Sequence, residues 1–223
     1  MNDIQHHGST AETVKVWDPI VRLVHWGLVL GVAVAWFSAE ESEFVHEWAG
    51  YVVAGLVALR LIWGFVGLRE ARFASFAPGP AAVLDYLKGL ASGTSRRHLG
   101  HNPAGGAMAI ALLVALLGTT GSGMALLALE EGEGPLALWF APAQDAVATG
   151  GGQARYEAHR EHADEDEHDG GEEFLEEIHE LFANATLALA LLHVLGVAAS
   201  SFAHRENLVR GMVTGRKRPL EDG

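Results

Sequence analysis

An uncharged run of 23 residues from Leu181 to Ala203 constrains the fold of this chain most strongly. A membrane-spanning helix needs about 20 predominantly apolar residues, so this run is long enough to cross a bilayer. Two histidines belong to the same segment, His179 just before the run and His193 in its middle. Ionisable side chains are costly inside a membrane and generally serve a function there. The segment therefore predicts a membrane helix that carries two imidazole ligands.

The two histidines fall on one face of this expected helix. They are 14 residues apart, which corresponds to about 40° from a whole number of turns and a rise of about 21 Å. Small residues line the face between them, namely Ala183, Thr186 and Ala190. A narrow groove bounded by two imidazoles suits flat cofactors at two depths. The alternative is that His179 lies at the membrane interface and His193 makes a hydrogen bond in a helix contact.

Three further apolar segments complete the expected membrane domain. Asp18-Pro19 and Asn102-Pro103 are typical helix starts, with a side-chain cap followed by proline in the first turn. No cleavable signal is evident in the polar N-terminal 15 residues, so we expect the first apolar segment to be retained. We expect an all-α membrane protein, a single four-transmembrane-helix bundle over residues 1–223, with helices at about 18–39, 44–68, 103–129 and 178–203.

The charged residues between these segments predict the orientation in the membrane. The 69–102 loop and the C-terminal tail carry five basic residues each, whereas the 40–47 turn has none. The 130–177 loop has fifteen acidic residues and two arginines. Cytoplasmic loops carry the excess of Lys and Arg. The pattern therefore predicts a multi-pass protein of the bacterial inner membrane, with both termini cytoplasmic and the acidic loops outside.

One part of the outer loop is both acidic and rich in histidine. Residues 150–171 include His159, His162 and His168 among aspartates and glutamates. A flexible, solvated loop is the default expectation for such a run. Capture of a divalent metal ion and docking of a basic soluble protein are the alternatives.

The expected topology sorts four histidines into two pairs by depth. His46 and His179 each begin a helix that enters from the outer side, so they are level. His25 and His193 both fall in the inner half. Two imidazoles on one haem iron leave no open axial position, which favours electron transfer over oxygen chemistry. Two such centres at different depths would provide an electron path through the membrane.

Two other basic side chains are candidates for contacts with a cofactor. Arg60 follows His46 by 14 residues and either extends to the interface or contacts a haem propionate. His101, with His98, ends the basic inner loop. These two histidines either cap the next helix at the surface or belong to a quinone or propionate site.

Composition excludes several classes of function. The chain contains no cysteine, which removes disulfides, iron–sulfur clusters, thiolate haem ligands and covalent Cys-x-x-Cys-His haem attachment. A formal charge of −13 argues against nucleic acid as a partner. The glycine-rich stretch 118–123 lies inside an apolar run with no basic residue, so it does not indicate a phosphate loop.

Several motifs resemble the bacterial cytochrome b561 family, which also covers the b-type cytochrome subunits of nickel–iron hydrogenases. They are the segments 16–26 (VWDPIVRLVHW), 46–51 (HEWAGY), 60–67 (RLIWGFVG) and 101–106 (HNPAGG), together with the His179/His193 helix. The resemblance spans all four helices and implies a membrane cytochrome with two haem b groups that exchanges electrons with the quinone pool. It implies His25, His46, His179 and His193 as the axial ligands, in agreement with the pairs His25/His193 and His46/His179.

The expected function is electron transfer across the inner membrane, between quinone or quinol and a redox partner, within a respiratory chain. Such a protein could act as a quinol or quinone oxidoreductase. A haem-bearing anchor subunit of a larger hydrogenase- or reductase-like complex is the main alternative, and a metal-ion transporter is another. The partners expected besides quinone are the lipid bilayer, a soluble periplasmic or peripheral redox protein, and a second copy of the chain in a homodimer.

Overall fold

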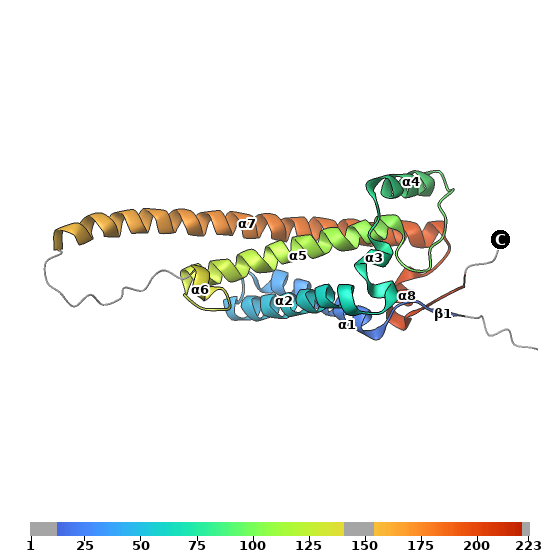
Figure 1. Ribbon diagram of the computed structural model, residues 1–223, viewed down its shortest axis with the longest axis horizontal. Helices are drawn as coiled ribbons and strands as arrows, with labels where there is room; N and C mark the ends of the chain where they lie inside the picture. Colours follow the sequence, from blue (N-terminus) through green and yellow to red (C-terminus); the bar gives the residue numbers. More distant parts are fainter. Residues whose placement is uncertain (1–12, 141–153, 220–223) are drawn as a thin grey trace, which may run out of the picture. The chain divides into compact units, whose positions relative to one another are not determined.

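A computed structural model of the chain describes residues 13–140 and 154–219 (Figure 1). Within them, four helices are long and apolar enough to cross a membrane, and in the last of these the apolar part is Gly170–Ala203. The predicted all-α class with four membrane-spanning helices is therefore confirmed. These helices are α1 (Pro19–Ser38), α2 (Glu43–Val66), α5 (Pro103–Glu130) and α7 (Ala154–Ala203).

Short elements connect the long helices and join the two ends of the described chain. Strand β1 (Val14–Lys15) pairs antiparallel with β2 (Arg216–Lys217), so that Val14 lies opposite Lys217. The other short elements are η1 (Arg69–Ala71), α3 (Phe73–Phe76) and α4 (Pro80–Ala91) between α2 and α5, α6 (Ala137–Phe140) after α5, and α8 (Leu208–Thr214) after α7.

Side-chain caps fix the starts of α1 and α5, as the sequence predicts. The amide of Val21 donates to Asp18 Oδ1 over 2.9 Å, and Trp63 Nε1 donates to the other oxygen of Asp18 over 3.1 Å. At α5, the amide of Gly105 donates to Asn102 Oδ1 over 2.7 Å. Each cap satisfies a backbone N–H that has no partner within the helix.

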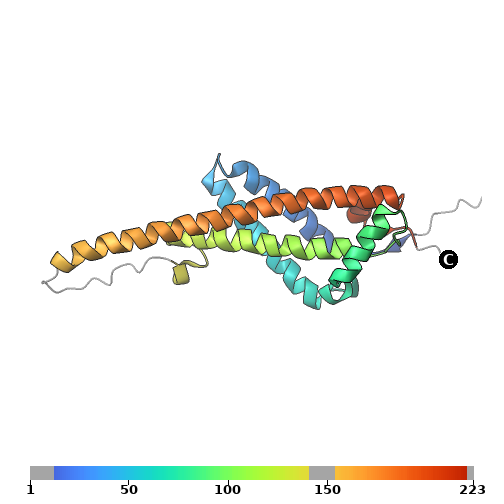
Figure 2. The same ribbon diagram turned by 90° about the horizontal axis from the view of Figure 1, so that it is seen from above.

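The start of α7 differs from the sequence-based expectation. The helix begins at Ala154, whereas the sequence indicated a helix from about residue 178 and a flexible loop over 150–171. Figure 2 shows α7 as one continuous helix. The segment contains no proline, and alanine, glutamate and arginine are strong helix formers, so an acidic composition does not prevent the helix. Residues 150–153 and the side chains of 154–169 lie outside the described part, so metal capture or docking there stays a prediction.

Close packing divides the chain into two compact units, and each takes a segment from every long helix. The described residues 13–30, 55–111 and 189–219 carry thirteen Lys and Arg against four Asp and Glu, and we call them the basic unit. The described residues 31–54, 112–140 and 154–188 carry two Arg against nineteen Asp and Glu, and we call them the acidic unit. The basic and the acidic residues of the described chain therefore belong largely to different units.

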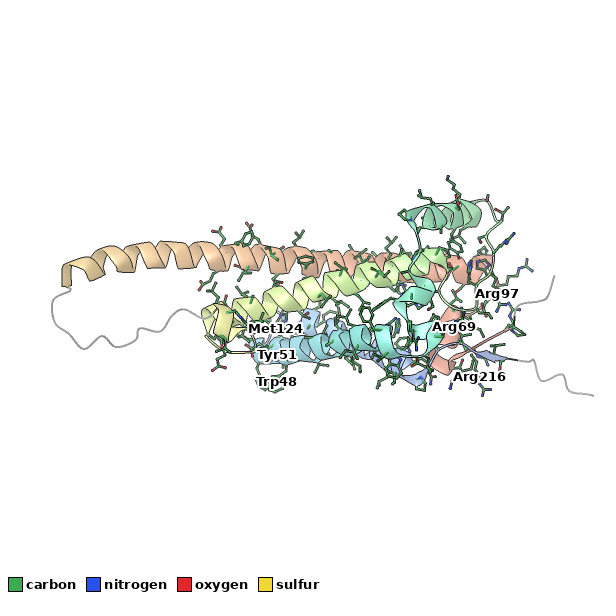
Figure 3. All side chains as sticks on the ribbon, in the orientation of Figure 1. Trp48, Tyr51, Arg69, Arg97, Met124 and Arg216 are labelled. Atoms are coloured by element: carbon green, nitrogen blue, oxygen red, sulfur yellow. The ribbon has the colours of Figure 1, made fainter. Side chains whose placement is uncertain are left out.

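A small core and one ion pair hold the polar end of the basic unit together. Val16, Trp17, Val21 and Ala71 are buried against one another. Arg97, labelled in Figure 3 with Arg69 and Arg216, forms a two-pronged ion pair with Glu206 at 2.7 and 3.1 Å. The same guanidinium donates to the carbonyls of Arg218 and Pro219, each over 2.7 Å. These contacts tie the loop before α5 to the C-terminal segment.

Candidate haem-binding site

One pair of histidines lies in the basic unit. His25 comes from α1 and His193 from α7, and their ring centroids are 6.3 Å apart. Both side chains are half-buried. The Nδ1 atom of His25 is buried and has no hydrogen-bond partner among the described residues. The structure therefore brings together the two histidines that the sequence analysis paired by depth.

The second pair lies in the acidic unit. His46 from α2 and His179 from α7 have ring centroids 6.1 Å apart. His46 Nδ1 lies 2.9 Å from the carbonyl oxygen of Ala35, and His179 Nδ1 lies 3.0 Å from that of Thr119. A carbonyl can only accept, so each Nδ1 carries the proton and donates it. Each Nε2 is consequently free to bind a metal ion.

The spacing within each pair fits two imidazoles bound to one metal ion from opposite sides. Two metal–nitrogen bonds of about 2.0 Å each, together with the depth of the two rings, require a centroid separation of this order. The observed values are 6.3 and 6.1 Å. Gly50, one turn after His46, and Gly196, three residues after His193, have no atom from the described part of the chain within 4 Å of an added Cβ. A flat group therefore has room beside each pair.

Helix α5 supplies no histidine, yet it positions one. A Cβ built on Gly123 would lie 2.9 Å from Cε1 of His179, so only glycine lets α5 approach the imidazole this closely. A Cβ on Gly118 would likewise overlap the ring of Phe182. Close packing at these glycines agrees with the small-residue contacts that membrane helices use.

Sequence reasoning missed the groups that orient His179 and His46. Ser122 Oγ lies 3.2 Å from His179 Nδ1 and adds to the contact with the Thr119 carbonyl. Nearby, the hydroxyls of Thr119 and Thr186 are 3.2 Å apart. Hydroxyl residues within the apolar α5 were a detectable signal, because such groups often bond across helices in a membrane. Backbone carbonyl acceptors leave no sequence signal.

Arg60 lies inside the basic unit and does not extend into solvent. Its side chain is 8% exposed, and its guanidinium lies 5.0 Å from the ring centroid of Phe73 and 5.7 Å from that of Phe76. Its Nη1 atom is buried without a hydrogen-bond partner in residues 13–140 and 154–219. A buried polar group without a hydrogen bond is costly, so this nitrogen is available to an acceptor, and the predicted contact with a haem propionate stays a prediction.

His101 is neither a helix cap nor a surface residue. The cap of α5 is Asn102, and the His101 ring stacks on Phe76 at 4.3 Å and meets Trp17 edge-on at 4.6 Å. Burial, followed by the positive charges of Arg60 and Lys217, lowers the pKa of His101 to about 3. The imidazole is therefore neutral at pH 7. Its Nδ1 has no partner within the described ranges, whereas His98 is exposed.

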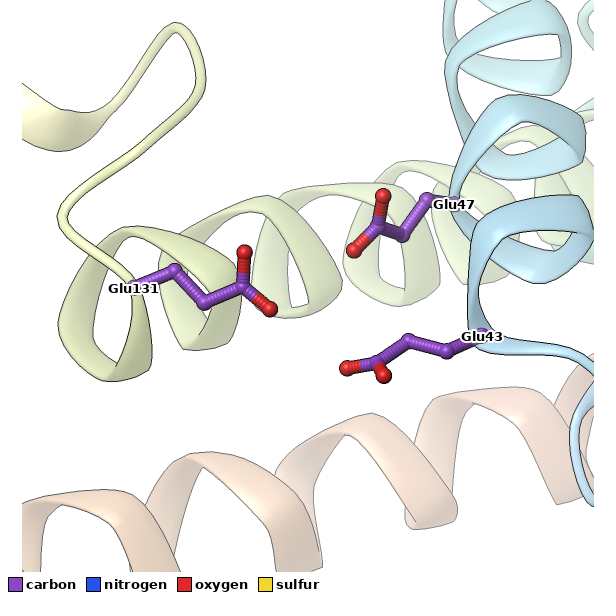
Figure 4. Close-up of side chains that lie close together, drawn as sticks. All are labelled: Glu43, Glu47 and Glu131. Atoms are coloured by element: carbon purple, nitrogen blue, oxygen red, sulfur yellow. The ribbon is translucent and has the colours of Figure 1, made fainter.

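Several carboxylates lie close to the His46/His179 pair of the acidic unit. Glu43, Glu47 and Glu131 have oxygens within 4.8 Å of one another (Figure 4). Partial desolvation and the neighbouring charges of Glu47 and Glu43 raise the pKa of Glu131. A cavity of 570 Å³ next to them is lined by His46 and by the acidic residues Glu40, Glu41, Glu43, Glu130 and Glu176. The pair His46/His179 is therefore in a negative environment.

Comparison with known proteins agrees with this geometry. A family model described as prokaryotic cytochrome b561 matches residues 16–215 of the 223-residue chain. The match covers α1, α2, α5 and α7, which provide all four paired histidines. No curated protein and no solved structure matches the chain. The chain belongs to the prokaryotic cytochrome b561 family and is a multi-pass bacterial membrane protein that binds b-type haem and transfers electrons.

Proposed function

We propose that the protein binds two b haems and transfers electrons across the bacterial inner membrane between the quinone pool and a redox partner. The observation that carries this proposal is the presence of two histidine pairs, each with the centroid spacing of a doubly ligated metal ion. His25 and His193 would hold one haem, and His46 and His179 the other. With two imidazoles on each iron, these haems would supply single-electron transfer rather than oxygen chemistry.

The residues around each pair would prepare it for this role. In the acidic unit, the carbonyls of Ala35 and Thr119 hold the imidazoles with Nε2 free for the iron. In the basic unit, Nη1 of Arg60 and Nδ1 of His101 have no hydrogen-bond partner among the described residues, and both are suited to a haem propionate or a quinone oxygen. We therefore propose Arg60 and His101 as the cofactor- or quinone-contacting residues of the cytoplasmic side.

The same proposal includes an orientation and a set of partners. The basic unit carries the loop 69–102 and both ends of the described chain, so the positive-inside rule supports cytoplasmic termini. The acidic connections 40–47 and 130–177 would then lie outside, where a soluble periplasmic or peripheral redox protein could bind. A homodimer is compatible with this arrangement.

A role as the haem-bearing anchor of a larger hydrogenase- or reductase-like complex is the second candidate. Helix α7 begins 16 residues before its candidate membrane span, at Ala154 rather than Gly170. A helical extension of about four turns outside the membrane would provide a helical surface to which a partner subunit could bind.

Addition of a reduced quinol to the protein in lipid nanodiscs tests the proposed electron source. We expect the quinol to reduce the haem without any other protein, as followed by the absorbance of the reduced b-type haem. Arg60→Gln should slow this reduction, because the replacement cannot supply the buried positive charge. Haem that dithionite reduces but quinol does not would contradict the quinone role and favour the anchor function.

A further inference from the structure

We infer that the site of His46 and His179 has a lower reduction potential than the site of His25 and His193, so that a single electron resides mainly in the basic unit at equilibrium. The inference rests on the proposed function, because it requires a haem at each pair. Two independent features of the structure support it: the charges around each pair and the hydrogen bonds that each imidazole makes.

The charges around His46 and His179 disfavour reduction. Residues 31–54, 112–140 and 170–188 contain no Lys or Arg and twelve Glu. Five of these carboxylates line the cavity that His46 also lines. Reduction adds one negative charge to the site, and a net negative surrounding raises the free energy of that state.

The hydrogen bonds of the same pair act in the same direction. Both imidazoles donate from Nδ1 to backbone carbonyls, at 2.9 Å for His46 and 3.0 Å for His179. Such a bond raises the basicity of the ligating nitrogen. A more basic ligand stabilises the more highly charged, oxidised iron, and this lowers the reduction potential.

The basic unit shows the opposite on both counts. Its buried charged side chains are the cations Arg60 and Lys217 and the anions Asp18 and Glu206, and Glu206 is already paired with Arg97. The unit as a whole carries thirteen Lys and Arg against four Asp and Glu. This excess of positive charge favours the added electron. The Nδ1 of His25 has no acceptor in the described structure, so this ligand lacks the bond that would raise its basicity.

A redox titration of the purified protein at pH 8, followed by absorbance, measures the two potentials directly. We expect two one-electron steps with at least a tenfold difference in equilibrium constant, which is about 59 mV. His46→Ala should remove the lower step and His25→Ala the upper one. Haem counted in the same preparation separates the inference from the proposed function. Fewer than two haems per chain would contradict the proposed function. Two haems with equal potentials, or with the higher potential at His46 and His179, would contradict this inference alone.

Charge variants test the physical cause without touching a ligand. The triple change Glu43→Gln, Glu130→Gln and Glu176→Gln removes three charges from the cavity next to His46. We expect it to raise the lower of the two reduction potentials by about 59 mV, a roughly tenfold change in equilibrium constant, and to leave the higher potential unchanged. The control is the triple change Glu133→Gln, Glu173→Gln and Glu177→Gln, which removes the same charge from exposed positions that do not line the cavity. We expect a smaller shift in the control, because its carboxylates do not line the cavity. No shift in the first triple variant, or a larger shift in the control, would overturn the inference.

Discussion

Replacing His193 with alanine is expected to lower the haem content of the purified protein from two per chain to one. Its ring lies 6.3 Å from that of His25, at the spacing of two imidazoles on one iron, so either single change removes half of the same site. The double variant His25→Ala/His193→Ala should therefore lose no more haem than either single variant. Combining His193→Ala with His46→Ala should remove both haems. Haem extracted per chain, measured as the pyridine complex, gives the result.

The control for this series is His98→Ala. His98 is exposed and bonds through Nδ1 to the carbonyl of Arg96, so its removal changes the histidine count but no pair. We expect two haems per chain in this variant. Loss of both haems from His193→Ala in a protein that still inserts and folds would show that the two pairs do not act as independent sites.

Replacing Gly123 with valine is expected to remove one haem as well, although Gly123 has no side chain to offer a ligand. A Cβ at this position would lie 2.9 Å from Cε1 and 3.1 Å from Nδ1 of His179. Contacts this short force one partner to move, and the imidazole is held by the carbonyl of Thr119. We therefore expect His179 to turn away from His46, with loss of the haem in the acidic unit and retention of the other.

Gly121 provides the matched control, two residues earlier on the same helix. A Cβ there meets no atom of the described residues within 4 Å. Gly121→Val has the same effect on helix propensity and hydrophobicity as Gly123→Val, and we expect it to keep two haems per chain. The difference between the variants is visible in the absorbance of the reduced protein. Equal haem content in both would mean that the close approach at Gly123 does not position His179.

The membrane helices were predictable because their signal is local. Uncharged runs, with starts at Asp18-Pro19 and Asn102-Pro103, predicted the bounds of α1, α2 and α5 to within about two residues. The beginning of α7 was not predictable in this way. Its acidic first half lacks an apolar stripe, and composition alone does not distinguish a charged helix from a charged loop.

The candidate site was predictable only in part, for a related reason. The partners His25/His193 and His46/His179 follow from counting residues along helices whose directions are known. The carbonyls of Ala35 and Thr119 and the burial of Arg60 depend on how neighbouring helices pack, which no single segment encodes. His101 is an example: its position before Asn102-Pro103 suggests a surface cap, whereas in the structure its ring packs against Trp17 and Phe76.

The haem content of the unmodified protein, together with its dithionite-reduced minus air-oxidised spectrum, tests the central claim most directly. Two pairs of imidazoles at 6.3 and 6.1 Å predict two haems per chain, both low-spin and of the b type. Expression must include an adequate haem supply so that the sites can fill. One haem per chain, or a high-spin spectrum that indicates an open axial position, would contradict the account.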